Sequence, residues 1–223
     1  RQMCIRDSIE YYNRHNSNLP SNNIYSIISD GYGGLWVASL EYLLHFDIDK
    51  RNFTIVDVDE DGHKLQQYNR LLFCDSKKRI WAGGEMGISV FNQVGTSLLP
   101  NTDFQIASVL KQAFVNCFYE TSSGYLWIGT RNGLFALKES DKQFLQYTTE
   151  NGLPSNVIYG ILEDAYGRLW ISTNQGLSCL NPESGKFRNF TIMDGLQGNQ
   201  FNAGAYCRKD NGYMLFGGVN GIT

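Results

Sequence analysis

Tryptophan recurs along this chain at a nearly constant interval. Trp36, Trp81, Trp127 and Trp170 are separated by 45, 46 and 43 residues, and Phe216 follows 46 residues later in the same local context. Around this aromatic residue the segments read GYGGLWVAS, SKKRIWAGG, SSGYLWIGT, AYGRLWIST and DNGYMLFGG. A period in the forties with four short strands per unit is typical of a β-propeller blade. We therefore expect an all-β propeller.

The repeat between residues 151 and 194 shows the expected strands most clearly. They lie at Val157–Glu163, Leu169–Thr173, Leu177–Asn181 and Lys186–Thr191. The first is an apolar run without helical periodicity, as in a strand buried on both faces. Short turns rich in glycine, aspartate, asparagine and proline separate the strands. Links this short join antiparallel neighbours, so each repeat is expected to form one antiparallel meander.

The other repeats divide the rest of the chain into four to five blades of an open, incomplete propeller. Their expected bounds are 19–60, 61–103, 104–150, 151–194 and 195–223, the last stopping roughly where its third strand should start. Ile9–Asn13 resembles the outer strand of a preceding blade. Residues 1–8 match nothing in the repeat and are interpreted as a non-native leader, with a genuine outer strand as the alternative.

Packing and turn formation account for the recurrent tryptophan and aspartate. Blades pack face to face, and an aromatic side chain buries about 150–250 Å², enough to fill the wedge between neighbours. Asp30, Asp75, Asp164 and Asp210 recur in a turn six residues before the aromatic residue, where a carboxylate can bond backbone amides. Sialidase-type Asp-boxes place the aspartate closer to the tryptophan, so this spacing argues against that class of enzyme.

Charge and residue spacing argue against several functions. A net charge of −3 gives no basic surface for nucleic acid, and no apolar run approaches the roughly 18 residues of a membrane span. His15, His45 and His63 lack metal-ligand spacing, and the five cysteines include no CxxC pair. No nucleophile elbow or phosphate-binding glycine loop is present. We expect no catalytic residue, no metal site and no cofactor.

Polar loops at one end of the propeller form the expected binding surface. Links between blades and hairpins between second and third strands emerge on the same face of such a meander, and loops carry propeller function. The candidate residues are Asn22, Glu85, Arg131, Asn132, Asn156, Asn174, Gln175, Asn199 and Asn220. Amides donate and accept hydrogen bonds, as sugar hydroxyls require. Asparagine also favours turns, so a structural role stays open for each.

Three units of the chain resemble the two-component regulator propeller repeat. They are NGLPSN at 151–156, DAYGRLWIST at 164–173 and the Gly176-Leu177 pair. Repeats one, three and four carry the resemblance best. The stretch DGLQGNQFNAGAY at 194–206 resembles the last blade before an immunoglobulin-like domain. Members of that family form the extracytoplasmic sensor of hybrid two-component histidine kinases, especially in glycan-degrading gut bacteria.

The resemblance implies a non-catalytic periplasmic sensing module that binds an oligosaccharide. It also implies a neighbouring propeller and an immunoglobulin-like domain in the same chain, and a homodimeric parent protein. No nucleic-acid partner and no direct membrane segment are expected in this stretch. Two alternatives stay open: a polysaccharide lyase or hydrolase, and a propeller for protein interaction. Acid, base or arginine residues clustered around the central channel would favour the enzyme.

Overall fold

Each sequence repeat folds into one antiparallel sheet. The computed structural model describes residues 9–39, 41–56, 69–101, 110, 113–138 and 143–223. Within these ranges the chain forms five sheets, of which four have four strands and the fifth has three. Besides strands they contain two short 3₁₀ turns, η2 (Thr149–Asn151) and η3 (Ile192–Asp194). The predicted all-β propeller is confirmed.

The strands lie within the expected blade ranges. The first blade comprises β1 (Ile24–Ser29), β2 (Gly34–Ser39), β3 (Leu43–Asp47) and β4 (Asn52–Ile55). The second comprises β5 (Asn69–Cys74), β6 (Arg79–Gly84), β7 (Gly87–Val94) and β8 (Ser97–Pro100). The third comprises β9 (Val115–Glu120), β10 (Tyr125–Thr130), β11 (Gly133–Lys138) and β12 (Gln143–Tyr147). The last two comprise β13 (Ile158–Glu163), β14 (Leu169–Thr173), β15 (Gly176–Asn181) and β16 (Lys186–Phe190), then β17 (Phe201–Arg208), β18 (Met214–Gly218) and β19 (Gly221–Ile222).

The fourth blade shows how local sequence sets the register. Trp170 of β14 lies opposite Leu162 of β13 and Cys179 of β15. The β14–β15 hairpin is closed by Thr173, whose hydroxyl donates to the Gly176 carbonyl at 2.8 Å. The central strand β15 is almost entirely buried, whereas β16 is largely exposed. Strands covered on both faces require nearly continuous apolar runs, which explains the pattern found in the sequence.

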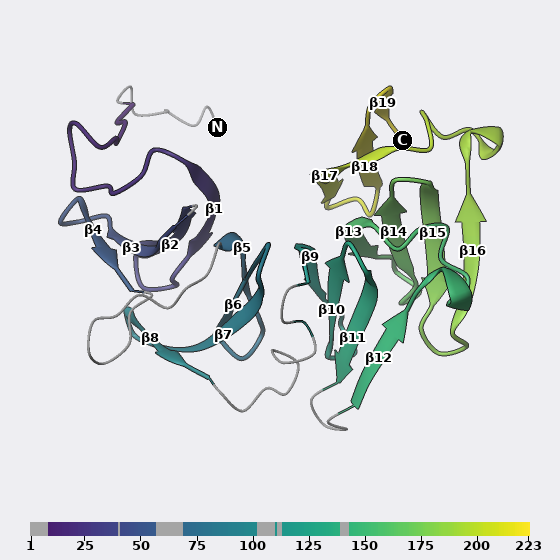
Figure 1. Cartoon of the computed structure of the whole chain (residues 1–223), viewed down its shortest axis with the longest axis horizontal. Helices are drawn as coiled ribbons and strands as arrows, with labels where there is room; N and C mark the ends of the chain where they lie inside the picture. The colour runs from purple at the N-terminus through teal and green to yellow at the C-terminus, as the bar shows by residue number, and fades with distance from the viewer. Residues whose placement is uncertain (1–8, 40, 57–68, 102–109, 111–112, 139–142) are drawn as a thin grey trace.

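The blades are arranged as an arc around a common centre (Figure 1). The first strand of each blade lies innermost, and β1, β5, β9, β13 and β17 follow one another as neighbours around the centre. The strands β4, β8, β12 and β16 lie on the outer side. The first and fifth blades form the two ends of the arc, in agreement with the expected open propeller.

The recurrent tryptophans pack between successive blades, as predicted. Trp36 is 0% exposed and shares an apolar cluster with Leu72 of the second blade. Trp127 is 1% exposed and packs with Ile158 of the fourth blade. Each of these indoles therefore joins its own blade to the next one, and the core is a series of clusters between blades.

The segment before the first blade differs from the sequence prediction. Ile9–Asn13 forms no strand. Tyr12 nevertheless packs edge-on against Phe46 and Phe53, with ring centroids 5.0 and 5.9 Å apart. In the fifth blade the third strand, β19, starts at Gly221 and pairs with β18, which agrees with the prediction that the sequence stops roughly where this strand starts. Residues 1–8 lie outside the described residues.

Candidate ligand-binding face

Hairpins and blade-to-blade links meet on one face of the arc. We call it the hairpin face; its hairpins are Glu85-Met86, Arg131-Asn132, Asn174-Gln175 and Val219-Asn220. Backbone hydrogen bonds join hairpins of the third and fourth blades to the links that follow them. The Gly133 N–H donates to the Asn156 carbonyl at 2.8 Å, and the Gly176 N–H donates to the Asn199 carbonyl at 2.6 Å. The candidate residues of the third to fifth blades therefore do share one face.

Three predicted asparagines have a structural role on this face. The side-chain oxygens of Asn22, Asn156 and Asn199 accept backbone N–H groups at positions 14, 149 and 192, at 2.9, 2.8 and 2.8 Å. The same bond thus recurs in three blades and fixes the link that enters each. Their conformational role, left open by the sequence, accounts for these side-chain oxygens.

The hairpin tips carry the remaining predicted amides. Asn132 and Gln175 are exposed, and their backbone N–H groups donate to threonine hydroxyls two residues earlier, at 2.9 and 3.0 Å. The Asn174 side-chain oxygen is buried and has no hydrogen-bond partner among the described residues. The Asn220 backbone N–H donates to the Gln197 side chain at 2.9 Å. These amides lie on three blades, and only Asn174 and Gln175 share a hairpin.

A β-bulge interrupts the inner strand of the first four blades at the same repeat position. The pairing of β1 with β2 skips Tyr25, and Arg70, Asn116 and Tyr159 are skipped at the corresponding point of β5, β9 and β13. All four residues stand eleven positions before the tryptophan of their blade. Bulges redirect side chains and are common beside binding sites.

Two of the predicted residues, Glu85 and Arg131, belong to one cluster. They are connected by side chains from the inner strands and from a blade-to-blade link. The arginine cluster consists of Tyr25, Arg70, Glu85, Phe114 and Arg131. Arg70 Nη2 lies 2.6 Å from Glu85 Oε1, and the Arg70 guanidinium carbon lies 5.1 Å from the centre of the Tyr25 ring. The Arg131 guanidinium carbon lies 3.7 Å from the centre of the Phe114 ring. Two cations against one carboxylate leave the cluster with a net positive charge.

The arginine cluster is accessible and retains unused donors. The side chains of Arg70 and Glu85 are 37% and 40% exposed, so solvent screens their ion pair and it contributes little to stability. Arg70 Nε is buried and has no hydrogen-bond partner among the described residues. Guanidinium groups bind carboxylate and sulfate-like oxygens in a fork geometry, so this cluster can hold an anionic group against aromatic rings.

Glu85 and Arg131 are predicted from the sequence, whereas Arg70, Phe114 and Tyr25 are not. The sequence predicts only a packing role for residues on the inner strands. The repeat alignment did contain a signal, because large side chains stand eleven positions before three of the four tryptophans. The sequence does not show that this position is a β-bulge. The bulge means that the side chain here does not follow the in–out alternation of the strand, so a role other than packing becomes possible.

On the opposite face, aspartates hold the first turn of the second and fourth blades, as predicted. The prediction for Asp210 was wrong, because the backbone bonds of the turn place Lys209 at the equivalent position of the fifth blade. Asp75 Oδ1 accepts backbone N–H groups at positions 77 and 79, and Asp164 Oδ1 accepts those at 166 and 168, all within 3.0 Å. Their second oxygens accept the indole N–H of Trp81 and Trp170, at 2.8 and 3.0 Å. Burial raises the pKa of Asp164, but the hydrogen bonds from Trp170 and the backbone hold it below its ordinary value of 3.8.

The first and third blades depart from this arrangement. Thr121 replaces the aspartate in the third blade, and its hydroxyl bonds to the backbone of residue 125 instead. In the first blade Asp30 is present, but its Oδ2 lies 2.7 Å from His45 Nε2. As a result, the buried indole N–H groups of Trp36 and Trp127 have no hydrogen-bond partner in the described part of the chain.

The residue two positions before the tryptophan explains the pairing of Asp30 with His45. In the second and fourth blades this residue is Arg79 or Arg168, whose Nε donates to the turn aspartate at 2.6 and 2.7 Å. The first blade has Gly34 there. A Cβ on Gly34 would lie 2.6 Å from Asp30 Oδ2 and 2.7 Å from His45 Nε2. Glycine therefore makes room for histidine to replace arginine as the partner.

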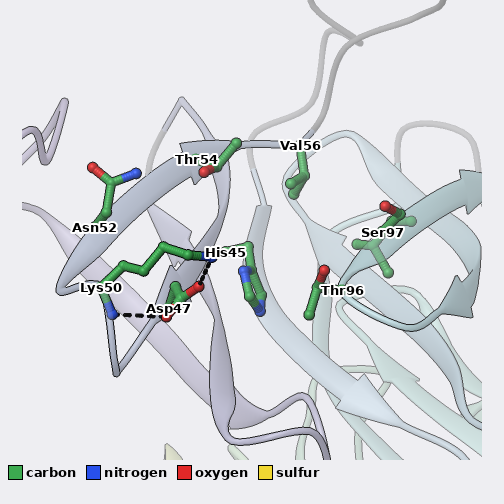
Figure 2. Close-up of a pocket in the computed structure, with 9 residues that line it drawn as sticks. His45, Asp47, Lys50, Asn52, Thr54, Val56, Thr96 and Ser97 are labelled. Atoms are coloured by element: carbon green, nitrogen blue, oxygen red, sulfur yellow. Dashed lines mark hydrogen bonds and ion pairs between the residues drawn. The ribbon is translucent and has the colours of Figure 1, made fainter.

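Grooves lie between blades beside these two exceptions. One groove of about 460 Å³ is lined by His45, Asp47 and Lys50 of the first blade and by Thr96 and Ser97 of the second (Figure 2). The other, of about 340 Å³, lies between the third and fourth blades. Thr54 and Val56 line the first groove, and Leu145 and Tyr147 line the second. In each pair the residues stand eighteen and twenty positions after the tryptophan of their blade. They are therefore equivalent positions of the repeat with different side chains.

The expected lack of a metal site remains an expectation. No group of three or more potential ligands occurs among the described residues; His63 lies outside them. No helix within the described ranges is long and apolar enough to cross a membrane.

The sequence model of the family described as two component regulator propeller matches residues 18–41, 110–132 and 152–175. These three segments are similar to two component regulator propeller repeats. The matches fall on the first, third and fourth blades, the ones that carried the resemblance best. Each runs from the blade-to-blade link to the region of the hairpin after the second strand. A comparison with curated protein sequences found no match.

Solved propeller structures share this fold. The chain superposes on the extracellular domain of a putative hybrid two component system from B. thetaiotaomicron with a TM-score of 0.74 and 22% identity, covering 89% of this chain and 27% of that one. PorZ, a surface component of the type-IX secretion system of Porphyromonas gingivalis, gives 0.71 and 16%, covering 96% and 34%. A virginiamycin B lyase from Staphylococcus aureus gives 0.61 and 16%, covering 90% and 65%. These identities show a common fold, and the chain spans 27% of the first structure's length.

Proposed function

We propose that this chain is a non-catalytic, ligand-sensing propeller module of a hybrid two-component signalling protein. Its ligand is an acidic oligosaccharide bound at the hairpin face. The arginine cluster carries this proposal, because it combines an excess of cationic donors with aromatic rings at an accessible position.

The chemistry of an acidic oligosaccharide fits the arginine cluster. A carboxylate or sulfate group would accept hydrogen bonds from Arg70 and Arg131, and a sugar ring face would pack on Tyr25, which is 44% exposed. The neighbouring sugar hydroxyls would meet the exposed amides of Asn132 and Gln175. Long-range attraction to the cationic cluster would speed association and weaken with added salt.

The setting of the module follows from the family. We place it outside the cytoplasm, in the periplasm, with a further propeller and an immunoglobulin-like domain in the same chain and a dimeric parent. The repeats and the fold shared with an extracellular domain of a two component system support this placement. Ligand binding at the hairpin face would then be passed on through these neighbouring domains.

The residues of the arginine cluster also support a role in binding and not in catalysis. Its single carboxylate, Glu85, is held in the ion pair with Arg70. The buried Asp30–His45 pair, which resembles a catalytic dyad, lies at the opposite end of the first blade, beside the β1–β2 turn. Acid–base cleavage of a sugar requires paired groups within reach of one bond, and these groups are separated.

Isothermal titration calorimetry tests this function, with tri-galacturonate as the carboxylated probe and maltotriose as the neutral probe. We expect tri-galacturonate to bind and Arg131→Ala to weaken it by about tenfold, the size of one lost charged hydrogen bond. Arg188→Ala is the matched control, because the Arg188 guanidinium also lies over a ring, that of Phe190, but on outer strand β16. Equal loss in both variants, equal binding of the two probes, or turnover of the probe would contradict the proposal.

A further inference from the structure

The groove between the third and fourth blades contains a buried donor without an acceptor. We call it the tyrosine groove; its lining residues are Ser122, Ser123, Tyr125, Trp127, Leu145, Tyr147, Glu163, Tyr166, Gly167, Asn181, Pro182 and Glu183. Its volume of about 340 Å³ falls in the range of roughly 300–1,000 Å³ for small-molecule sites. It lies away from the hairpin face, beside the first turns of the third and fourth blades.

Trp127, whose indole N–H is buried and unpartnered among the described residues, is one of the residues that line this groove. In the second and fourth blades the equivalent N–H donates to the carboxylate of the turn aspartate. In the third blade Thr121 occupies that position, and the turn residues Ser122 and Ser123 line the groove. Trp127 is 1% exposed, and its N–H has no hydrogen-bond partner in the described residues. Buried donors are nearly always paired, so an acceptor from outside the chain fits here.

An acceptor is also held in place across the groove. The Glu163 carboxylate accepts the Ser122 backbone N–H and its hydroxyl, both at 3.0 Å, which joins the inner strand of the fourth blade to the turn of the third. A carboxylate has acceptor capacity beyond two bonds. The groove therefore offers one fixed donor, Trp127, and one fixed acceptor, Glu163.

The rest of the lining includes three tyrosines and carries no positive charge. Tyr125, Tyr147 and Tyr166 contribute ring surface, and the Tyr147 ring stacks on Trp127 with centroids 5.8 Å apart. No lysine, arginine or histidine is among the lining residues that the structure describes, whereas Glu163 and Glu183 are. An anionic ligand would meet unpaired carboxylates here, at a cost in binding free energy. A neutral ring bearing hydroxyl groups satisfies the donor, the acceptor and the aromatic faces together.

We propose that the tyrosine groove binds one neutral sugar ring. One hydroxyl oxygen of the sugar accepts the Trp127 indole N–H, and another hydroxyl donates to Glu163. The site is separate from the arginine cluster in position and opposite in charge preference, so it stands whether or not the hairpin face binds an acidic oligosaccharide.

The equivalent groove between the first and second blades provides a natural comparison. It is lined by His45, Asp47 and Lys50 and by no tyrosine or tryptophan among the described residues (Figure 2). Trp36 also has an unpartnered buried N–H, but it is not among the residues lining that groove. The Trp36 indole N–H therefore serves as an internal control: it is buried and unpartnered among the described residues, but it does not line that groove.

Two-dimensional ¹H–¹⁵N NMR of the whole chain tests the proposal. The four indole N–H signals are assigned with Trp→Phe variants, and methyl β-glucopyranoside and methyl β-galactopyranoside are the probes. We expect one of them to shift the Trp127 signal in a saturable way at millimolar concentration, with Trp36, Trp81 and Trp170 unmoved. No shift at about 100 mM, where even a Kd near 10 mM would give nearly full occupancy, would overturn the site. So would equal shifts at Trp36, or a response to choline chloride and not to either sugar.

A second variant separates ligand binding from loss of folding. Thr121→Asp supplies the third blade with the acceptor found in the second and fourth, so the Trp127 signal should move towards those of Trp81 and Trp170 without sugar. The sugar response should then fall at least tenfold. Arg131→Ala, which removes a hairpin-face residue, should leave the sugar response unchanged; loss of the response in that variant would overturn the separate site.

Discussion

In the second and fourth blades, one carboxylate oxygen pair accepts four hydrogen bonds, from two backbone amides, an arginine and the tryptophan. This residue fixes the turn, orients the indole and neutralises the arginine. The sequence predicted the turn role from the position of aspartate before glycine and tryptophan. It could not predict the indole bond, because Asp30 has the same spacing and pairs with His45 instead.

Removing one of these aspartates should destabilise the fold. Asp75→Ala leaves the buried Trp81 N–H and the turn amides without their acceptor, so we expect the free energy of unfolding to fall by about 2–4 kcal/mol. Asp210→Ala is the control, since Asp210 is exposed and stands one residue after Lys209, which occupies the position of Asp75 in the fifth blade; its cost should stay below about 0.5 kcal/mol. Urea denaturation measures both, and equal losses would contradict this account of the turn.

The lowered pKa of Asp164 makes one part of stability depend on pH. Because its folded pKa lies below the ordinary 3.8, its contribution is fully present above that value and is lost as the pH falls through the folded pKa. The stability difference between the wild type and Asp164→Asn should therefore be constant at pH 5–7, and it should shrink below about pH 4. Urea titrations at each pH give this difference; a gap that widens on acidification would refute the assignment.

At the scale of strands and turns, the alternation of apolar runs and turn residues predicts the strands of the fourth blade to within a residue. The sequence indicates a strand at Val157–Glu163, and β13 covers Ile158–Glu163. The bulges were not predictable in the same way, because a skipped residue depends on how two strands pair and not on either strand alone. The asparagine caps were missed for a related reason: asparagine suits both a turn and a ligand site, and its partner lies seven or eight residues away.

Hairpin geometry yields a prediction at this scale. Gly133 has φ +119°, and a Cβ there would lie 2.6 Å from the Tyr147 carbonyl oxygen, so Gly133→Ala combines backbone strain with a backbone clash. We expect a loss of about 2–4 kcal/mol. Gly167→Ala is the control, because φ is +73° with nothing within 4 Å, and strain alone should cost about 1 kcal/mol. Thermal denaturation compares the two, and equal shifts in Tm would exclude the clash.

At the scale of the whole molecule, the five blades form an arc whose end blades expose apolar side chains. Tyr25 and Ile27 on β1 are 44% and 57% exposed, and Val219 and Ile222 of the fifth blade are 58% and 70% exposed. The repeat period predicted this architecture. It did not predict the arginine cluster, because the residues of that site come from three blades, whose repeats are about 45 residues apart. These residues come together only when neighbouring blades pack against each other.

Such exposed surfaces should make this chain associate with itself. Apolar blade faces and sheet edges are sites of association, so the apparent mass in sedimentation should rise with protein concentration. Ile27→Lys, at an exposed position of β1, should reduce the association without lowering Tm. A monomer whose apparent mass does not change with concentration would show that the ends of the arc are not association surfaces.

We propose that the hairpin face, and not the opposite end, receives the acidic oligosaccharide. Hydrogen–deuterium exchange with and without tri-galacturonate locates the ligand most directly. We expect slower exchange in peptides that contain Tyr25, Arg70, Glu85, Phe114 and Arg131, with unchanged exchange in the turns at 30–33, 75–78 and 164–167. Protection confined to those turns, or no protection at saturating ligand, would contradict the claim.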